Sequence, residues 1–361
     1  LSPELGGQGF GQVKLGLITP LTGGASFYGE RQRQGVELAV DVINKRGGIL
    51  GKQITVIVED NQTNNAQTVA LVRKVSSDQD IVAIVAPVQS GTFMAGAPIA
   101  ESVGIVWASA GAGGLWGDGL PNAWTFRNTY PFSKMVDDFM RKVAAEMKPS
   151  SIAAIYSPDN EGMVSPQKIG AATLASLGID SRTVLTAPTG TRNFGPQITT
   201  LIQANPTAVH INLSTGDAAL FMRQARDREL KSQFISAALG LVDLQVIKLS
   251  GGAAEGAIVP ATFDPTASVP ATVEFVKAWN AKHGVLSDFL SAYAYDIVFT
   301  LAEAMKAAGT TTDRKAVRDA FGKIKNLCLA AGCYTWNGPG DATGGSIRLV
   351  RLSSKGFLSW P

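Results

Sequence analysis

The clearest candidate for chemistry in this chain is a small hydroxyl cluster, Ser90-Gly91-Thr92, which follows a buried strand pattern and opens a helix pattern. The first amide groups of a helix lack intrahelical partners and lie at the positive end of the helix dipole. Such a helix start binds a carboxylate without any Arg or Lys. We expect these residues and the preceding Gln89 to contact an anionic ligand, and simple helix capping is the alternative.

Residues for catalysis are scarce. The chain has two histidines; His210 lies in an apolar strand pattern and His283 lies at the end of a helix pattern, so we assign both to structure. No nucleophile-elbow or phosphate-loop motif occurs. The pair Gly111 and Gly113 follows a strand, but a dinucleotide fingerprint would need a third glycine where Trp116 stands. We therefore expect no enzyme activity, no cofactor and no metal.

Polar residues follow two strands in the second half of the chain. They are Asn160 with Glu161, and Ser214 with Asp217. Parallel α/β sheets bind ligands beyond the carboxyl ends of their strands, so these residues are ligand candidates. Capping of the following helix is the alternative, with Thr215 or Asp217 as the N-cap residue of the helix after the second of these strands.

The two cysteines, Cys328 and Cys333, are separated by four residues. Reduced thiols, a redox site and a structural disulfide are the possibilities. A dithiol redox site usually has two intervening residues, and a metal site would need the two histidines as partners. We predict a disulfide between Cys328 and Cys333, which favours an oxidising compartment outside the cytoplasm.

Composition excludes several classes of protein. The net charge is +3 and no run of Lys or Arg forms a basic stripe, so we expect no nucleic-acid partner. No stretch of about 20 apolar residues is long enough to cross a membrane. The chain begins with Leu1 instead of Met, which is consistent with removal of a signal peptide.

Strand and helix patterns alternate along most of the chain, and this predicts an α/β fold with parallel sheets. Residues 23–29 are expected as a loop, and 121–131 as a break that carries aromatic residues. After residue 259 the pattern is mostly helical until a last strand. The predicted strands are 13–22, 54–60, 81–86, 104–109, 151–156, 181–185, 207–213, 233–238 and 345–353; the predicted helices include 132–147, 163–177, 193–204, 216–228, 272–283, 287–308 and 312–325.

Several motifs together resemble one known family, the type I periplasmic solute-binding proteins of ABC importers, in the branched-chain amino-acid (leucine/isoleucine/valine) binding family. The resemblance covers residues 12–355. It rests on Gly23-Gly-Ala-Ser-Phe-Tyr-Gly29 followed by Gly35-Val-Glu-Leu-Ala39, Asn44-Lys-Arg-Gly-Gly-Ile49 with Gly51, Asp60 with the helix over 67–75, Phe221-Met-Arg-Gln-Ala225 and Ala292-Tyr-Ala-Tyr-Asp296.

The resemblance implies two doubly wound parallel-sheet lobes, joined by three crossovers, with an interlobe ligand cleft and hinge closure. Lobe 1 would be residues 12–128 plus 262–334, and lobe 2 residues 129–261 plus 335–361. The late helices would then return to lobe 1, which the plain pattern does not show. It also implies a periplasmic or otherwise extracytoplasmic location, a membrane permease as partner and, in our expectation, a monomer.

The amino-acid site of the family matches only in part. Ser90 matches the serine that holds the ligand carboxylate, and Tyr28 and Tyr295 match aromatic wall positions. Gly113 stands where the family has a threonine. Glu161 and Ser214 replace aromatic residues of the second lobe, and the acidic partner of the ligand ammonium falls at Ala238 or Leu239.

An α-amino acid needs that counter-charge because burying an unpaired ammonium is costly. We therefore expect a small organic carboxylate without a required amine, most simply an arylcarboxylate or aryl-keto acid; Glu161 or Asp217 could replace the lost acid. The alternatives are a branched-chain amino-acid binder and a cytoplasmic ligand-sensing regulator with the same fold. The expected ligand contacts are Phe27, Tyr28, Gln89, Ser90, Gly91, Thr92, Ser109, Ala110, Gly111, Trp116, Asn160, Glu161, Ser214, Ala238, Leu239 and Tyr295.

Overall fold

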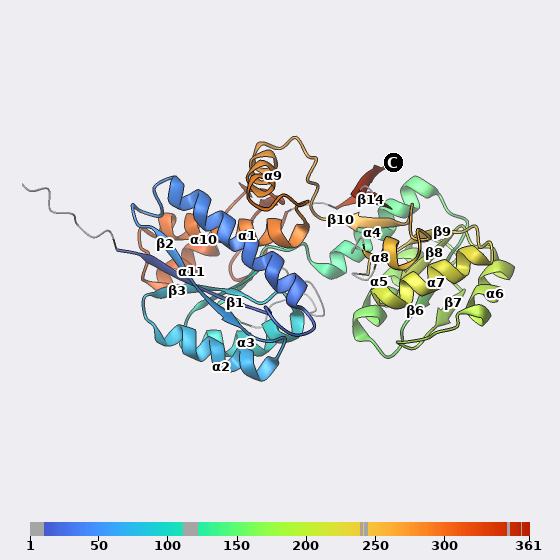
Figure 1. Ribbon diagram of the computed structural model, residues 1–361, viewed down its shortest axis with the longest axis horizontal. Helices are drawn as coiled ribbons and strands as arrows, with labels where there is room; N and C mark the ends of the chain where they lie inside the picture. The colour runs from blue at the N-terminus through green and yellow to red at the C-terminus, as the bar shows by residue number, and fades with distance from the viewer. Residues whose placement is uncertain (1–10, 111–121, 239–240, 242–244, 345–346, 355) are drawn as a thin grey trace, which may run out of the picture. The chain divides into compact units, whose positions relative to one another are not determined.

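Two units, each built on its own β-sheet, make up the computed structural model, which describes residues 11–110, 122–238, 241, 245–344, 347–354 and 356–361 (Figure 1). Unit 1 comprises the chain up to Tyr130 and Phe263–Ser346, and unit 2 comprises Pro131–Thr262 and Ile347–Pro361. The sheets and helices confirm the predicted α/β class. In the described part of the chain, no helix is long and apolar enough to cross a membrane.

The sheet of unit 1 has the strand order β13-β5-β4-β3-β1-β2, and its neighbours pair in parallel. Two of its inner strands, Val13–Thr19 and Ile81–Ala86, are almost fully buried because helices cover both faces. The elements are β1 Val13–Thr19, α1 Ser26–Lys45, β2 Ile54–Asp60, α2 Asn65–Ser77, β3 Ile81–Ala86, α3 Ser90–Val103, β4 Val106–Ser109, β5 Thr125–Arg127, α9 Pro270–His283, α10 Phe289–Ala308, α11 Arg314–Phe321, β11 Leu327–Cys328, β12 Cys333–Tyr334 and β13 Gly340–Asp341.

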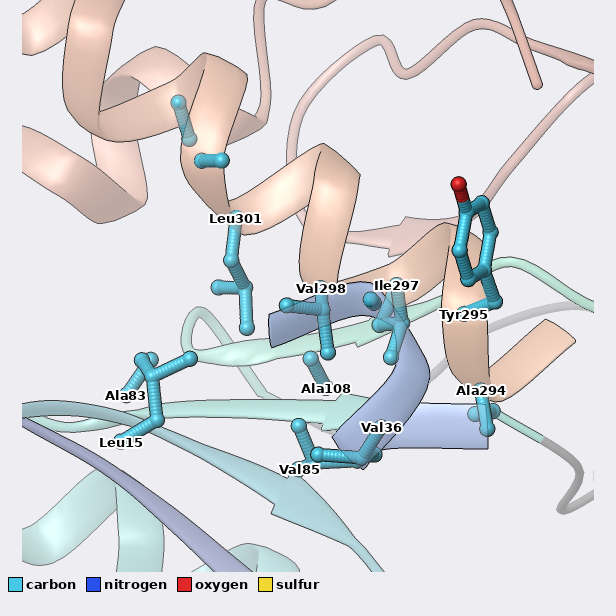
Figure 2. Packing of buried hydrophobic residues seen from close by; sticks show 14 of the residues in the cluster. Leu15, Val36, Ala83, Val85, Ala108, Ala294, Tyr295, Ile297, Val298 and Leu301 are labelled. Atoms are coloured by element: carbon cyan, nitrogen blue, oxygen red, sulfur yellow. The ribbon is translucent and has the colours of Figure 1, made fainter. Parts of the chain in front are cut away.

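Two hydrophobic layers pack against this sheet. On one face, Val36 of α1 and Val298 and Leu301 of α10 meet strand residues such as Val85 (Figure 2). On the other face, α2 and α3 bury a second cluster that includes Val72. Figure 1 shows the β1 strand between α1 on one side and α2 and α3 on the other. The late helices therefore belong to unit 1, as the family resemblance implies.

Unit 2 has the strand order β15-β14-β10-β9-β8-β6-β7, with an antiparallel end formed by β10, β14 and β15. Its core contains three aromatic rings in contact: Phe194 meets Phe221 edge to face, and Phe234 lies tilted against Phe221. Its elements are α4 Phe132–Met147, β6 Ile152–Tyr156, α5 Glu161–Ser176, β7 Val184–Thr186, α6 Gly195–Ala204, β8 Ala208–Asn212, α7 Thr215–Asp227, β9 Gln233–Ile235, α8 Gln245–Leu249, β10 Ile258–Ala261, β14 Arg348–Ser353 and β15 Gly356–Trp360.

The structure corrects several expected elements. The predicted break at 121–131 contains β5, and α8, β10 and β15 had not been predicted. The predicted loop 23–29 is wrong at its end because α1 begins at Ser26. Residues 340–341 form β13 and pair with β5 of unit 1, whereas the resemblance placed 335–361 in lobe 2. Strands this short carry too few residues to show a period.

Candidate functional site

The hydroxyl cluster after β3 opens a helix, as the sequence predicts. Gln89 is the N-cap residue of α3, and Ser90 is the first residue of that helix. The Gln89 side chain makes no capping hydrogen bond, and the first turn carries no acidic residue. The Thr92 hydroxyl donates to the Gln89 carbonyl at 3.1 Å. The positive end of this helix is therefore not neutralised by an acidic side chain of its own first turn. We call residues Gln89–Thr92 the anion loop.

Two aromatic side chains lie in the first turn of α1, where the sequence had predicted a loop. Phe27 is 50% exposed and Tyr28 is 39% exposed. Their rings meet edge to face with centroids 5.8 Å apart, and the Arg31 guanidinium carbon lies 5.4 Å from the Phe27 ring centre. Because α1 follows β1, α3 follows β3 and these strands pair in parallel, the two rings and the anion loop lie at the same edge of the sheet. We call Phe27 and Tyr28 the aromatic pair.

Tyr295 lies in the interior of unit 1. It is 4% exposed, and its ring centre is 5.0 Å from that of Phe275 and 4.7 Å from that of Phe299. Burial, together with the negative charge of Glu274, raises the pKa of its hydroxyl. The aromatic wall role that the resemblance gives to this residue remains a prediction.

The end of β4 is buried as well. Ser109 is the last residue of that strand; both it and Ala110 are 0% exposed. Gly111 and Trp116 lie outside the described residues, so their predicted ligand contacts stay predictions.

The predicted residues of unit 2 cap two helices. Asn160 is the N-cap residue of α5, and its side chain accepts from the Gly162 amide at 3.1 Å; Glu161 is the first residue of that helix. Ser214, not Thr215 or Asp217, is the N-cap residue of α7, so that expectation is wrong. Ala238 is fully buried. Leu239 lies outside the described residues.

Asp217 already has partners within unit 2. One carboxylate oxygen, Oδ2, accepts from the Ser214 hydroxyl at 2.9 Å and from the Gly190 amide at 3.0 Å. The side chain is largely buried, with the residue 9% exposed. Its position in the first turn of α7 is favourable for a negative charge. Asp217 therefore has structural partners in the fold, although it is not the N-cap residue that the sequence suggested.

The predicted structural role of His210 agrees with its surroundings. Its ring lies in β8 with Nδ1 3.3 Å from Asn212 Nδ2, and burial lowers its pKa to about 4. The ring is therefore neutral at pH 7.

A buried cation at the edge of unit 1 was not predicted from the sequence. Arg127, the last residue of β5, pairs in register with Ser109. Its Nε and Nη2 atoms each donate to a carboxylate oxygen of Asp341 at 2.6 Å, and the Arg127 side chain is 4% exposed. An arginine at the end of a three-residue strand offers no periodic signal, so only the fold identifies it.

Gln32 was not predicted either, although its position in the sequence indicates a structural role. Gln32 precedes Val36 by four residues and therefore shares the apolar stripe of α1. It is fully buried and bonded at both ends of its amide. A polar residue on an apolar helix face predicts such a buried link.

The predicted disulfide is confirmed. Cys328 and Cys333 are bonded and close the loop between β11 and β12. The buried Asp296 carboxylate stabilises this loop, because it accepts from the Ala330 and Ala331 amides at 2.9 and 2.8 Å. The Tyr334 hydroxyl donates to the same carboxylate at 2.7 Å.

Comparison with known proteins gives consistent similarities over nearly the whole chain. A family model described as "Periplasmic binding protein" matches residues 12–356. "Leu/Ile/Val-binding protein homolog 1" of Brucella abortus is 28% identical over 328 residues, which are 87% of this chain and 83% of the relative.

Two solved structures illustrate the shared fold. The Streptococcus pneumoniae protein LivJ, described as a branched-chain amino acid transporter substrate binding protein in complex with isoleucine, has a TM-score of 0.83 at 20% identity and covers 96% of this chain and 98% of its own. An R. palustris solute-binding protein in complex with benzoate has a TM-score of 0.77 at 17% identity, covering 97% of this chain and 95% of its own. At these identities, the likeness shows the fold alone.

Proposed function

The chain belongs to the periplasmic binding protein family. We propose that it captures a small aromatic carboxylate for an ABC importer. Solute binding of the periplasmic-binding-protein type follows from the family. The aromatic carboxylate is the finer part of the proposal. Location outside the cytoplasmic membrane, a permease as partner, a monomeric state and closure of two lobes on the ligand belong to the proposal too.

One observation carries the choice of ligand class. The start of α3, with no acidic residue in its first turn, lies at the same edge of the unit 1 sheet as the exposed aromatic pair. A carboxylate suits the helix start, and a flat apolar body suits offset or edge-on contact with Phe27 and Tyr28.

Two further observations support a ligand without an amine. By the family resemblance, the position of the acidic partner of the ligand ammonium falls at Ala238 or Leu239 of this chain. In addition, a relative in fold is described in complex with benzoate, so an aromatic acid fits this architecture in at least one protein. Relatives named for leucine, isoleucine and valine make branched-chain amino acids the second candidate class.

Titration calorimetry tests this choice with benzoate, phenylglyoxylate, leucine and valine as probes. Benzoate or phenylglyoxylate should bind more tightly than leucine or valine. Tight binding of leucine without binding of either aromatic acid would overturn the ligand class and leave solute capture intact.

A variant at the anion loop locates the carboxylate. Ser90→Ala should weaken binding of the aromatic acid by about 1.5–3 kcal/mol, or roughly 10- to 100-fold, because it removes a hydrogen bond to a charge. Ser102→Ala is the matched control, since that hydroxyl donates to the Ile99 carbonyl near the other end of α3. Equal affinities for the two variants would remove Ser90 from the site.

A further inference from the structure

One buried side chain connects the two candidate ligand elements of unit 1. The Gln32 amide nitrogen donates to the carbonyl of Ala86, the last residue of β3, at 2.7 Å. Its amide oxygen accepts from the Thr19 hydroxyl at 2.6 Å, and Thr19 is the last residue of β1. Both side chains are 0% exposed. Gln32 therefore joins α1 to the carboxyl ends of two neighbouring strands.

The partners of Gln32 lie next to the residues expected to meet ligand. Ala86 precedes the N-cap residue Gln89 by three positions, so its carbonyl is the last one of β3 before the anion loop. On the helix side, Gln32 is four residues, or about one turn, after Tyr28. The Gln32 hydrogen bonds thus connect the helix turn that follows the aromatic pair with the strand end that precedes the anion loop.

The first turn of α1 also packs closely on the chain that leaves β1, and Asp60 at the end of β2 holds that chain. A Cβ atom at Gly29 would lie 1.9 Å from the Pro20 carbonyl oxygen, so the helix start packs directly on the chain that leaves β1. Asp60 accepts from the Leu21 amide at 2.9 Å and from the Thr22 hydroxyl at 2.6 Å. The backbone that carries the aromatic pair is therefore held by these contacts together with the Gln32 hydrogen bonds.

We propose that Gln32 and Thr19 are positioning residues that set the spacing between the aromatic pair and the anion loop, and thereby select ligands by the distance from carboxylate to ring. This inference rests on the proposed function. Neither side chain needs to touch ligand for this role. Because buried amides are costly to leave unpaired, loss of either partner changes the geometry of both elements together.

The experiment compares four variants of the full chain. Gln32→Met removes both hydrogen bonds, and Thr19→Val removes the hydroxyl at nearly constant shape. Thr19→Ser keeps the hydroxyl and is the conservative rescue. Gln224→Met is the matched control in unit 2, where that amide donates to the Arg192 carbonyl at 2.9 Å and accepts from the Phe194 amide at 2.8 Å.

The first readout needs no ligand. Fluorotyrosine is incorporated throughout, and the ¹⁹F resonance of Tyr28 is assigned with Tyr28→Phe. This resonance should shift in Gln32→Met and in Thr19→Val, and should remain in place in Thr19→Ser and in Gln224→Met. An unshifted resonance in Thr19→Val, which is the milder of the two disruptive changes, would overturn the positioning role even if Gln32→Met fails to fold.

The second readout is the affinity for benzoate by calorimetry. Gln32→Met and Thr19→Val should each weaken it by about 3- to 10-fold, the scale of one lost hydrogen bond, and Thr19→Ser by less than about twofold. Equal losses in Thr19→Ser and Thr19→Val would overturn the selection of ligands. Equal losses for benzoate and for phenylglyoxylate, whose carboxylate lies one carbon further from the ring, in Thr19→Val would overturn it too. If the Tyr28 resonance shifts as expected but benzoate does not bind the parent protein, the positioning stands and the proposed ligand class fails.

Discussion

Replacing the buried carboxyl of Asp296 with an amide should change how the stability of unit 1 depends on pH. The carboxyl is 0% exposed and accepts from two amides of the disulfide loop and from the Tyr334 hydroxyl. Burial raises its pKa to about 7, from an ordinary value of 3.8, against the opposing effect of these donors. The folded state therefore holds a proton that the unfolded chain releases at much lower pH.

The sign and size follow from proton linkage. Stability contributed by this group is complete below about pH 4, and it is lost as the pH rises toward 7, because the folded protein binds more protons than the unfolded chain in that interval. The slope is at most about 1.4 kcal/mol per pH unit, so the total change is roughly 4 kcal/mol. Tyr334, the titratable group in direct contact, has its pKa raised further by burial and does not titrate in this range.

The assay is urea unfolding of the parent and of Asp296→Asn between pH 4 and pH 8. The measured quantity is the difference in unfolding free energy between the two proteins, since the other carboxyl groups then cancel. Exchange of the Ala330 and Ala331 amides reports the same region separately from unit 2. Asp313→Asn, at the exposed N-cap of α11, is the control.

Two results would refute this reasoning. A free-energy difference that does not vary with pH would mean that Asp296 keeps one protonation state throughout. A parent protein that gains stability over Asp296→Asn as the pH rises would mean that the three donors outweigh burial and hold the carboxylate ionised.

Two further predictions concern packing and charge in unit 1. Gly29→Ala should destabilise the protein by more than about 2 kcal/mol because its Cβ would overlap the Pro20 carbonyl, whereas Gly24→Ala, with open space around it, should be nearly neutral by thermal unfolding. Arg127→Met should lower the free energy of unfolding in urea by about 2–3 kcal/mol, because it leaves the partly buried Asp341 without its partner. Lys134→Met, in an exposed pair with Asp138, should lower it by less than about 0.5 kcal/mol. Similar losses within either pair of variants would contradict the corresponding argument.

The elements that the sequence predicts well are those with a long, regular apolar pattern. The helix over 132–147 is found with the same bounds because Met135, Phe139 and Val143 form one continuous face. The strands β2 and β3 also agree with their predicted ranges. In each case the local apolar pattern agrees with the burial in the fold, so tertiary contacts did not change the secondary structure that the pattern predicts.

The elements that the sequence does not predict depend on partners far along the chain. β13 has two residues, and it exists as a strand because β5, more than two hundred residues earlier, pairs with it. The same holds for the Arg127–Asp341 ion pair, whose members lie 214 positions apart. Gln32 differs, because its position on the apolar stripe of α1 follows from the sequence alone.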